Sequence, residues 1–174
     1  MIGENATRSA FLAAMKTRPD IGLVYIASHA VTDPQNPLTK GYIAMRGGHY
    51  LAKDIRDTDF WKGRHPIVVL SACQTGLGGT LRGGHFGVAQ SWMAAGAGQV
   101  VASLWNVGDN STKVVMGSFM KHLKAGNAPE FAMQKAQVDM LNYRTRSGKY
   151  PFWNDPKLWS GFIIFGKPSL SSDL

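Results

Sequence analysis

Four short runs of apolar residues divide the chain and predict buried β-strands. They cover residues 21–27, 66–71, 98–104 and 160–165. The apolar positions within them are continuous rather than alternating, which is typical of parallel strands covered on both faces. We therefore expect a sheet that lies inside the molecule, with other elements packed on each side of it.

Segments with helical periodicity separate these strands. They span residues 7–16, 51–61, 87–95, 110–124 and 128–143, and residues 41–50 have the pattern of a small hairpin. Thr7 is suited to cap the first helix, because its hydroxyl can accept a hydrogen bond from the first turn. Strands that alternate with helices predict a doubly wound or related three-layer α/β fold. In such folds the reactive groups lie at the carboxyl ends of the strands.

Composition narrows the class of protein. The 174 residues are 44% hydrophobic and 17% charged, so the chain is globular and suits a single domain. A single cysteine excludes an internal disulfide and any multi-cysteine metal site. No apolar run is long enough to span a membrane, and residues 1–14 lack a secretory signal, so a cytoplasmic location is the default expectation. The net charge of +8 fits either a basic, well-solvated surface or an acidic partner such as nucleic acid.

Two of the predicted strands are followed by residues with reactive side chains. His29 comes two positions after the first strand, and Cys73 comes two positions after the second. If these strands are parallel neighbours, the two side chains emerge together at one edge of the sheet. A free thiol ionises near pH 8.5, so a histidine within hydrogen-bond reach would activate it. The alternative is that Cys73 is a small apolar residue of the core.

Several stretches, in this order, together resemble one family. They are the strand ending in His29, the strand ending in Ser-Ala-Cys73, the glycine-rich stretch 83–101, the Ala-Ser-Leu-Trp-Asn-Val-Gly-Asp stretch 102–109, and the aromatic segments 151–153 and 159–166. The chain resembles the CHAT domain, a caspase-like domain of the caspase–separase–gingipain group that is often found beside TPR repeats in bacteria. The resemblance covers nearly the whole chain and implies a three-layer α-β-α caspase-like fold with a mostly parallel sheet, as one domain over residues 1–174.

The resemblance implies a cysteine endopeptidase that needs no cofactor or metal. Cys73 would be the nucleophile, His29 would protonate the leaving amine, and the backbone N–H groups of Cys73 and Ala30 would hold the oxyanion. The family often has glycine at the position of Ala30. Asp109, with Trp105 and Ser103, would line the pocket for a basic residue of the substrate; the alternative is that Asp109 simply caps the following helix.

The family usually has a further strand and helix upstream of residue 1. We therefore expect an exposed sheet edge that is completed by a sensor or TPR-type protein partner or by the missing N-terminal segment. The substrate would be a protein, and nucleic acid is not expected as a direct ligand. A second class of function stays open: a latent or non-catalytic CHAT module that acts by docking.

Other features have ordinary explanations. Asp33 either orients the imidazole of His29 or forms a turn with the proline that follows it. His49 and His85 have no partners at metal-binding spacing. The glycines of residues 76–79 lack the rest of a phosphate-binding loop. The tryptophans are expected in the core or in a pocket wall, and these are Trp92, Trp105 and Trp153.

Overall fold

A computed structural model describes residues 3–18, 20–33, 35–59, 61, 63–71, 84–145, 147–149 and 155–168. The helices are α1 (Arg8–Thr17), α2 (Ala52–Arg56), α3 (Gly84–Ala94), α4 (Asp109–Lys124) and α5 (Pro129–Asn142), with short 3-10 turns at Gly3–Asn5 and Pro156–Leu158. The strands are β1 (Leu23–Ala27), β2 (Ala30–Val31), β3 (Tyr42–Met45), β4 (Gly48–Leu51), β5 (Ile67–Ser71), β6 (Gln99–Ser103) and β7 (Phe162–Gly166).

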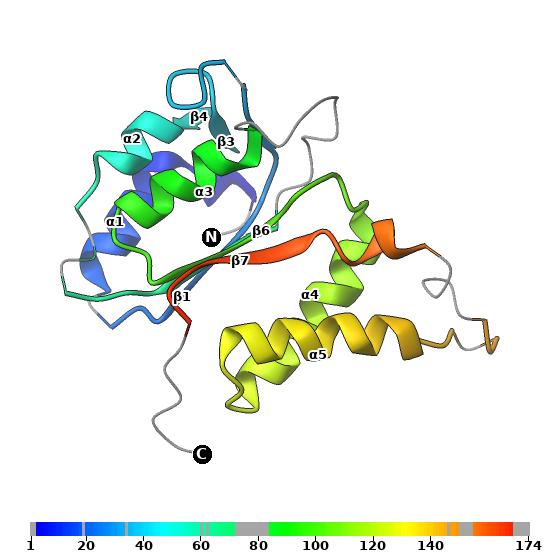
Figure 1. The fold of residues 1–174 in the computed structure, drawn as a ribbon. Coiled ribbons are helices and arrows are strands. Elements are labelled where there is room, and N and C mark those ends of the chain that lie inside the picture. Colours follow the sequence, from blue (N-terminus) through cyan, green and yellow to red (C-terminus); the bar gives the residue numbers. More distant parts are fainter. Residues whose placement is uncertain are drawn as a thin grey trace.

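The main sheet has four strands in the order β1-β5-β6-β7. Strands β1, β5 and β6 are parallel, and β7 closes the sheet antiparallel to β6. A second, antiparallel sheet has the order β2-β3-β4 and contains the expected hairpin. Helices cover both faces of the main sheet: α1, α2 and α3 lie on one side and α4 and α5 on the other (Figure 1). The expected three-layer α/β fold is confirmed.

The core on the α1–α3 side is built around aromatic rings. Trp92 of α3 is fully buried; it stacks on Trp61 with ring centroids 5.5 Å apart and meets Phe11 and Tyr50 edge-on. Burial of Trp61 explains why α2 ends at Arg56 rather than continuing to residue 61 as predicted, because the chain must turn to bring this indole under α3. The predicted cap of α1 is confirmed, since Thr7 Oγ1 accepts from the Ala10 N–H at 3.2 Å.

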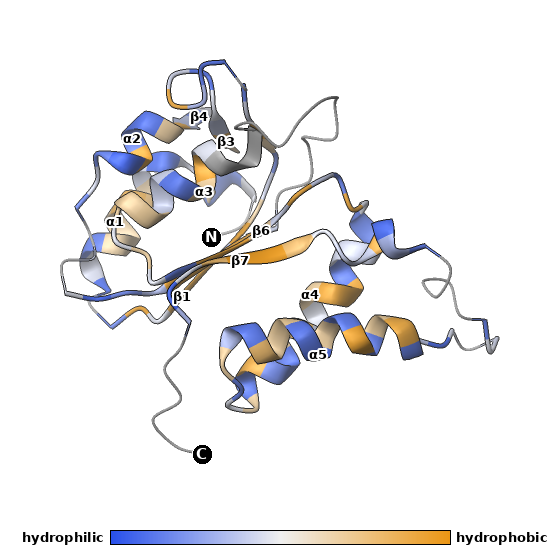
Figure 2. Ribbon diagram, viewed as in Figure 1, coloured by the Kyte–Doolittle hydropathy of each residue, from blue (hydrophilic) through white to orange (hydrophobic). Residues whose placement is uncertain are grey.

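The core on the α4–α5 side is aliphatic and lies beneath β5, β6 and β7. Val69 and Val101 of the sheet are fully buried with Phe119 of α4 and Ala136 of α5. Apolar residues are concentrated along the strands, while the helices alternate between apolar and polar positions (Figure 2). Phe131 of α5 stays outside this core with 52% of its surface exposed.

Strand β1 departs from the expectation that every strand is covered on both faces. Val24 and Ile26 are buried under α1, but Tyr25 on the opposite face is 41% exposed. The helix pair α4–α5 packs beneath the other strands and leaves this face of β1 open within the described part of the chain. None of the helices described is long and apolar enough to cross a membrane.

Candidate active site

The carboxyl ends of the three parallel strands lie level with one another. Ala27, the last residue of β1, is the register partner of Ser71, the last residue of β5. In the next pair of strands, Val69 of β5 is the register partner of Val101 of β6. Each strand continues for two more residues, so β5 ends at Ser71 and β6 ends at Ser103 at the same level. This edge is where a parallel α/β sheet presents functional groups.

His29 leaves the sheet at this edge. It follows Ala27 by two residues, lies between β1 and β2, and is exposed. Its carbonyl oxygen accepts a hydrogen bond of 2.8 Å from the Ala44 N–H of β3, which fixes its backbone against the second sheet. Cys73, the expected nucleophile, lies outside the described residues, two positions after Ser71.

The backbone N–H of Ala30, the second expected oxyanion donor, takes no part in the ladder between β2 and β3. The Ala44–His29 bond makes that pair a hydrogen-bonded position of the antiparallel ladder, so the next pair, Ala30 with Ile43, is a non-bonded position. The N–H of Ala30 therefore points away from β3. Because β2 has no second strand neighbour among the described residues, no strand accepts from this N–H, although Ala30 itself is buried.

Asp33 forms the turn and does not orient the imidazole. Its Oδ1 accepts from the backbone N–H groups of Gln35 and Asn36, each at 2.8 Å, and Lys40 lies 3.6 Å from Oδ2. The bond from Asn36 is the main cause that lowers the pKa of this carboxyl group. A hollow of about 520 Å³ follows β2 and is lined by Val31, Thr32, Asp33, Gln35 and Lys40.

The three residues expected to line a specificity pocket follow one another between the carboxyl end of β6 and the start of α4. Ser103 ends β6, Trp105 follows it by two residues, and Asp109 is the first residue of α4. Gly108, with φ +38°, occupies the N-cap position of α4. Its N–H donates to Asn106 Oδ1 at 3.2 Å, but no side chain makes a capping hydrogen bond with the first turn of the helix. The alternative that Asp109 caps the helix is therefore wrong, and its exposed carboxylate has no structural bond at the cap.

Trp105 and Ser103 differ in how they are held. The indole Nε1 of Trp105 donates to the carbonyl oxygen of Lys157 at 2.7 Å, and its ring lies against Gly161, where an added Cβ would come within 2.8 Å of Cε2. Ser103 is 2% exposed, and its hydroxyl has no hydrogen-bond partner. A buried hydroxyl without a partner costs free energy, but buried polar atoms of Thr32, Tyr50, Trp92 and Gln99 share this state, so it does not single out the end of β6.

The remaining residues singled out in the sequence do not join this site. His49 stacks on Tyr42 in the hairpin, with ring centroids 3.8 Å apart. The described residues contain no group of three or more side chains that could hold a metal ion. The side chain of His85, the glycines of residues 76–79 and Trp153 lie outside the described part of the structure.

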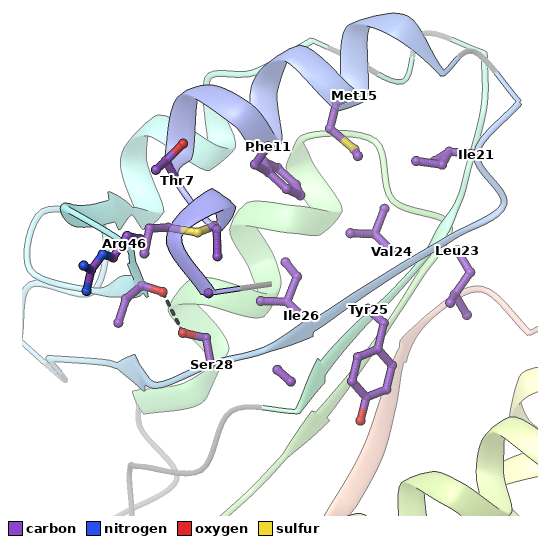
Figure 3. A pocket seen from close by; sticks show the side chains of 15 residues that line it. Thr7, Phe11, Met15, Ile21, Leu23, Val24, Tyr25, Ile26, Ser28 and Arg46 are labelled. Atoms are coloured by element: carbon purple, nitrogen blue, oxygen red, sulfur yellow. Dashed lines mark hydrogen bonds between the residues drawn. The ribbon is translucent and has the colours of Figure 1, made fainter. Parts of the chain in front are cut away.

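A cavity that the sequence did not indicate lies beside β1. It has a volume of about 460 Å³ and lies between α1, the outer edge of β1 and the end of β3 (Figure 3). Its walls are mostly apolar and include Phe11, Met15 and Ile26, and it ends at Ser28 and Ala44, next to His29. Within the described part of the chain, β1 has no strand neighbour on this side. Residues 44–46, which are distant in sequence, complete the wall, so no local sequence pattern indicates the cavity.

Comparison with known proteins identifies the family. The model of the CHAT domain matches residues 1–167, nearly the whole chain. No curated protein matches the chain at a significant level. Together with the mostly parallel sheet between two helical layers, the match shows that the chain belongs to the CHAT family, whose members are caspase-like, peptidase-related domains.

Proposed function

We propose that this CHAT domain is a cysteine endopeptidase that uses Cys73 and His29 as a catalytic dyad. The observation that carries the proposal is the parallel register of β1 and β5, which ends level at Ala27 and Ser71. His29 follows Ala27 by two positions and Cys73 follows Ser71 by two positions, which supports assigning the dyad to this edge of the sheet. Membership of a caspase-like, peptidase-related family supports the same chemistry.

The proposed reaction proceeds in two steps. The Cys73 thiolate attacks the scissile carbonyl carbon, and the carbonyl electrons move to its oxygen, which accepts hydrogen bonds from the N–H groups of Ala30 and Cys73. The C–N bond then breaks, and the His29 imidazolium gives its proton to the departing amine. Water, deprotonated by His29, hydrolyses the resulting thioester and restores the thiolate. That the Ala30 N–H points away from β3 supports its part in this scheme.

We further propose a preference for a basic residue before the scissile bond. Asp109 is exposed at the start of α4, makes no capping hydrogen bond, and follows Trp105 by four residues. An exposed carboxylate beside an anchored indole suits the charge and the long aliphatic stem of arginine or lysine.

Covalent probes test the proposal. The purified domain is treated with peptidyl acyloxymethyl ketones that carry arginine or leucine before the reactive group, and the adduct is located by mass spectrometry. We expect labelling at Cys73 that is lost in His29→Ala and in Cys73→Ala, and a preference for arginine that falls in Asp109→Ala. Labelling that does not depend on His29 would contradict the dyad, and equal labelling by both probes would contradict the specificity.

A second candidate function is a latent or non-catalytic module that docks to a sensor or TPR-type partner. The edge of β1 that has no strand neighbour among the described residues favours it, because an edge strand with unpaired N–H and C=O groups can receive another strand. Absence of labelling by both probes, in a protein whose circular dichroism shows it to be folded, would favour this function over the peptidase.

A further inference from the structure

The segment that carries His29 is a very short connection between two sheets. β1 ends at Ala27 in the main sheet and β2 begins at Ala30 in the second sheet, so Ser28 and His29 alone make the crossing. Any movement of this connection moves the His29 side chain and the Ala30 N–H together. What fixes the connection therefore fixes both groups.

Two hydrogen bonds, both to Ala44 of β3, hold this connection. The hydroxyl of Ser28 donates to the Ala44 carbonyl oxygen at 2.6 Å, and the Ala44 N–H donates to the His29 carbonyl oxygen at 2.8 Å. A regular antiparallel ladder would supply the Ala44 carbonyl with the N–H of His29 as its donor. Among the described residues that bond is absent, and the Ser28 hydroxyl takes its place (Figure 3).

The partner side of this arrangement is a central strand that is paired on both edges. Ala44 lies inside β3, which pairs with β2 on one side and β4 on the other. Its neighbour Ile43 is fully buried. The connection, in contrast, borders the cavity of about 460 Å³ beside β1, whose lining includes both Ser28 and Ala44. Strand pairing holds the connection at Ala27 and at Ala30, and the hydroxyl bond of Ser28 ties it to β3 on the side that borders this cavity.

We propose that Ser28 is a positioning residue, whose hydroxyl bond to Ala44 holds His29 and the Ala30 N–H in the geometry that the reaction needs. The inference rests on the proposed peptidase function. A displacement of about 1 Å at a catalytic group can cost roughly a hundred-fold in rate. Loss of a single hydrogen bond costs only about 1 kcal/mol of stability, so the effect on catalysis should greatly exceed the effect on folding.

The test compares Ser28→Ala with Ser28→Thr, which keeps a hydroxyl, and with Ser91→Ala as the matched control. Ser91 is buried and also donates to a backbone carbonyl, that of Gly87 at 2.8 Å, but it lies within α3. We expect Ser28→Ala to lower the maximal rate of Cys73 inactivation by the faster of the two ketone probes about ten- to a hundred-fold, with the half-saturating probe concentration unchanged. Ser28→Thr should restore most of the rate, and Ser91→Ala should match wild type.

Hydrogen exchange of the Ala44 amide supplies a readout that does not depend on activity. Ser28→Ala should raise its exchange rate at least about ten-fold, because the bond to His29 opens more often when its neighbour is lost. Unchanged exchange and an unchanged inactivation rate would overturn the positioning role. Faster exchange in a protein that neither probe labels would leave the hydroxyl bond established and refute the peptidase function instead. A rate loss of equal size in Ser91→Ala would show a general effect of stability and would also overturn the proposal.

Discussion

Strands β6 and β7 lie above the helix pair α4–α5, whereas β1, at the opposite edge of the same sheet, has no helix beneath it among the described residues. Val101 in β6 is fully buried, but Tyr25 in β1 is 41% exposed. The connection that carries His29 leaves from the open side and is held by two hydrogen bonds. The comparison indicates that both faces of the sheet are covered at β6 and β7, whereas β1 is covered on one face only and leads into the segment that carries the proposed catalytic histidine.

Phe119→Ala should give the largest loss of stability, because it leaves a cavity in the middle of the core between helices α4–α5 and strands β5–β7. Its ring is fully buried beneath β5–β7. Truncation of a buried phenylalanine costs about 3 to 5 kcal/mol, which urea unfolding would measure. A loss below about 1 kcal/mol would contradict the place of Phe119 in the middle of this core.

Gly161→Ala should strain the same core near the proposed specificity pocket. An added Cβ would lie 2.8 Å from Cε2 of Trp105 and 3.1 Å from Cγ2 of Val107, so the indole must move. Overpacking of this kind costs about 1 to 3 kcal/mol. We also expect the preference for the arginine probe over the leucine probe to fall. An unchanged preference together with the stability loss would remove Trp105 from the pocket.

Asp139 should make a small, pH-dependent contribution to the free energy of unfolding, because its side chain links α5 to α4. Its Oδ2 accepts from the Ser118 hydroxyl at 2.5 Å and lies 2.8 Å from His122 Nε2. Burial acts to raise the pKa of this carboxyl, but the bonds from Ser118 and His122 outweigh it and the pKa is lowered. A lowered pKa stabilises the folded state above the pKa of the unfolded chain, and the contribution is lost as the pH falls below about 4.

The measurement is the free energy of unfolding of Asp139→Asn and wild type at pH 6 and near pH 3. Because the carboxylate is half exposed, we expect a difference of roughly 0.5 kcal/mol at pH 6 that shrinks at low pH. Asp20→Asn, at an exposed position, serves as the control and should show no such trend. A difference that grows towards low pH would contradict the assigned direction.

Tyr25→Lys should have the smallest effect, because this side chain projects from the open face of β1. A change at an exposed position away from special contacts usually alters stability by less than about 0.5 kcal/mol. A lysine in place of Val101, which is fully buried, should prevent folding or lower the free energy of unfolding several-fold more than Tyr25→Lys. Equal losses at the two positions would mean that the open face of β1 is covered in solution.

The sequence predicted most of the architecture because long apolar runs and helix periodicity are local signals. All four strands of the main sheet and the hairpin are confirmed, with ends shifted by up to two residues. Strand β2 was missed since two residues carry no periodicity. The early end of α2 was missed as well, because it depends on the contact of Trp61 with Trp92, 31 positions away in the chain.

Prediction of the site was less complete, for a similar reason. The motif residues His29, Ser103, Trp105 and Asp109 could be selected from the sequence, and the level strand ends support their grouping. The hydrogen bond between Ser28 and Ala44 joins residues that are 16 positions apart in the sequence and links the β1–β2 connection to the second sheet, so no local sequence pattern predicts it. The cavity beside β1 likewise depends on which residues the fold brings to an edge.

The most direct test of the central claim is the pH dependence of alkylation of Cys73 by iodoacetamide, in wild type and in His29→Ala. The chain contains no other cysteine, so the total rate reports this thiol alone. An ordinary cysteine ionises near pH 8.5, so a thiol paired with His29 should react well below that pH and His29→Ala should move the midpoint up towards about 8.5. Coincident pH profiles for the two proteins would contradict the dyad.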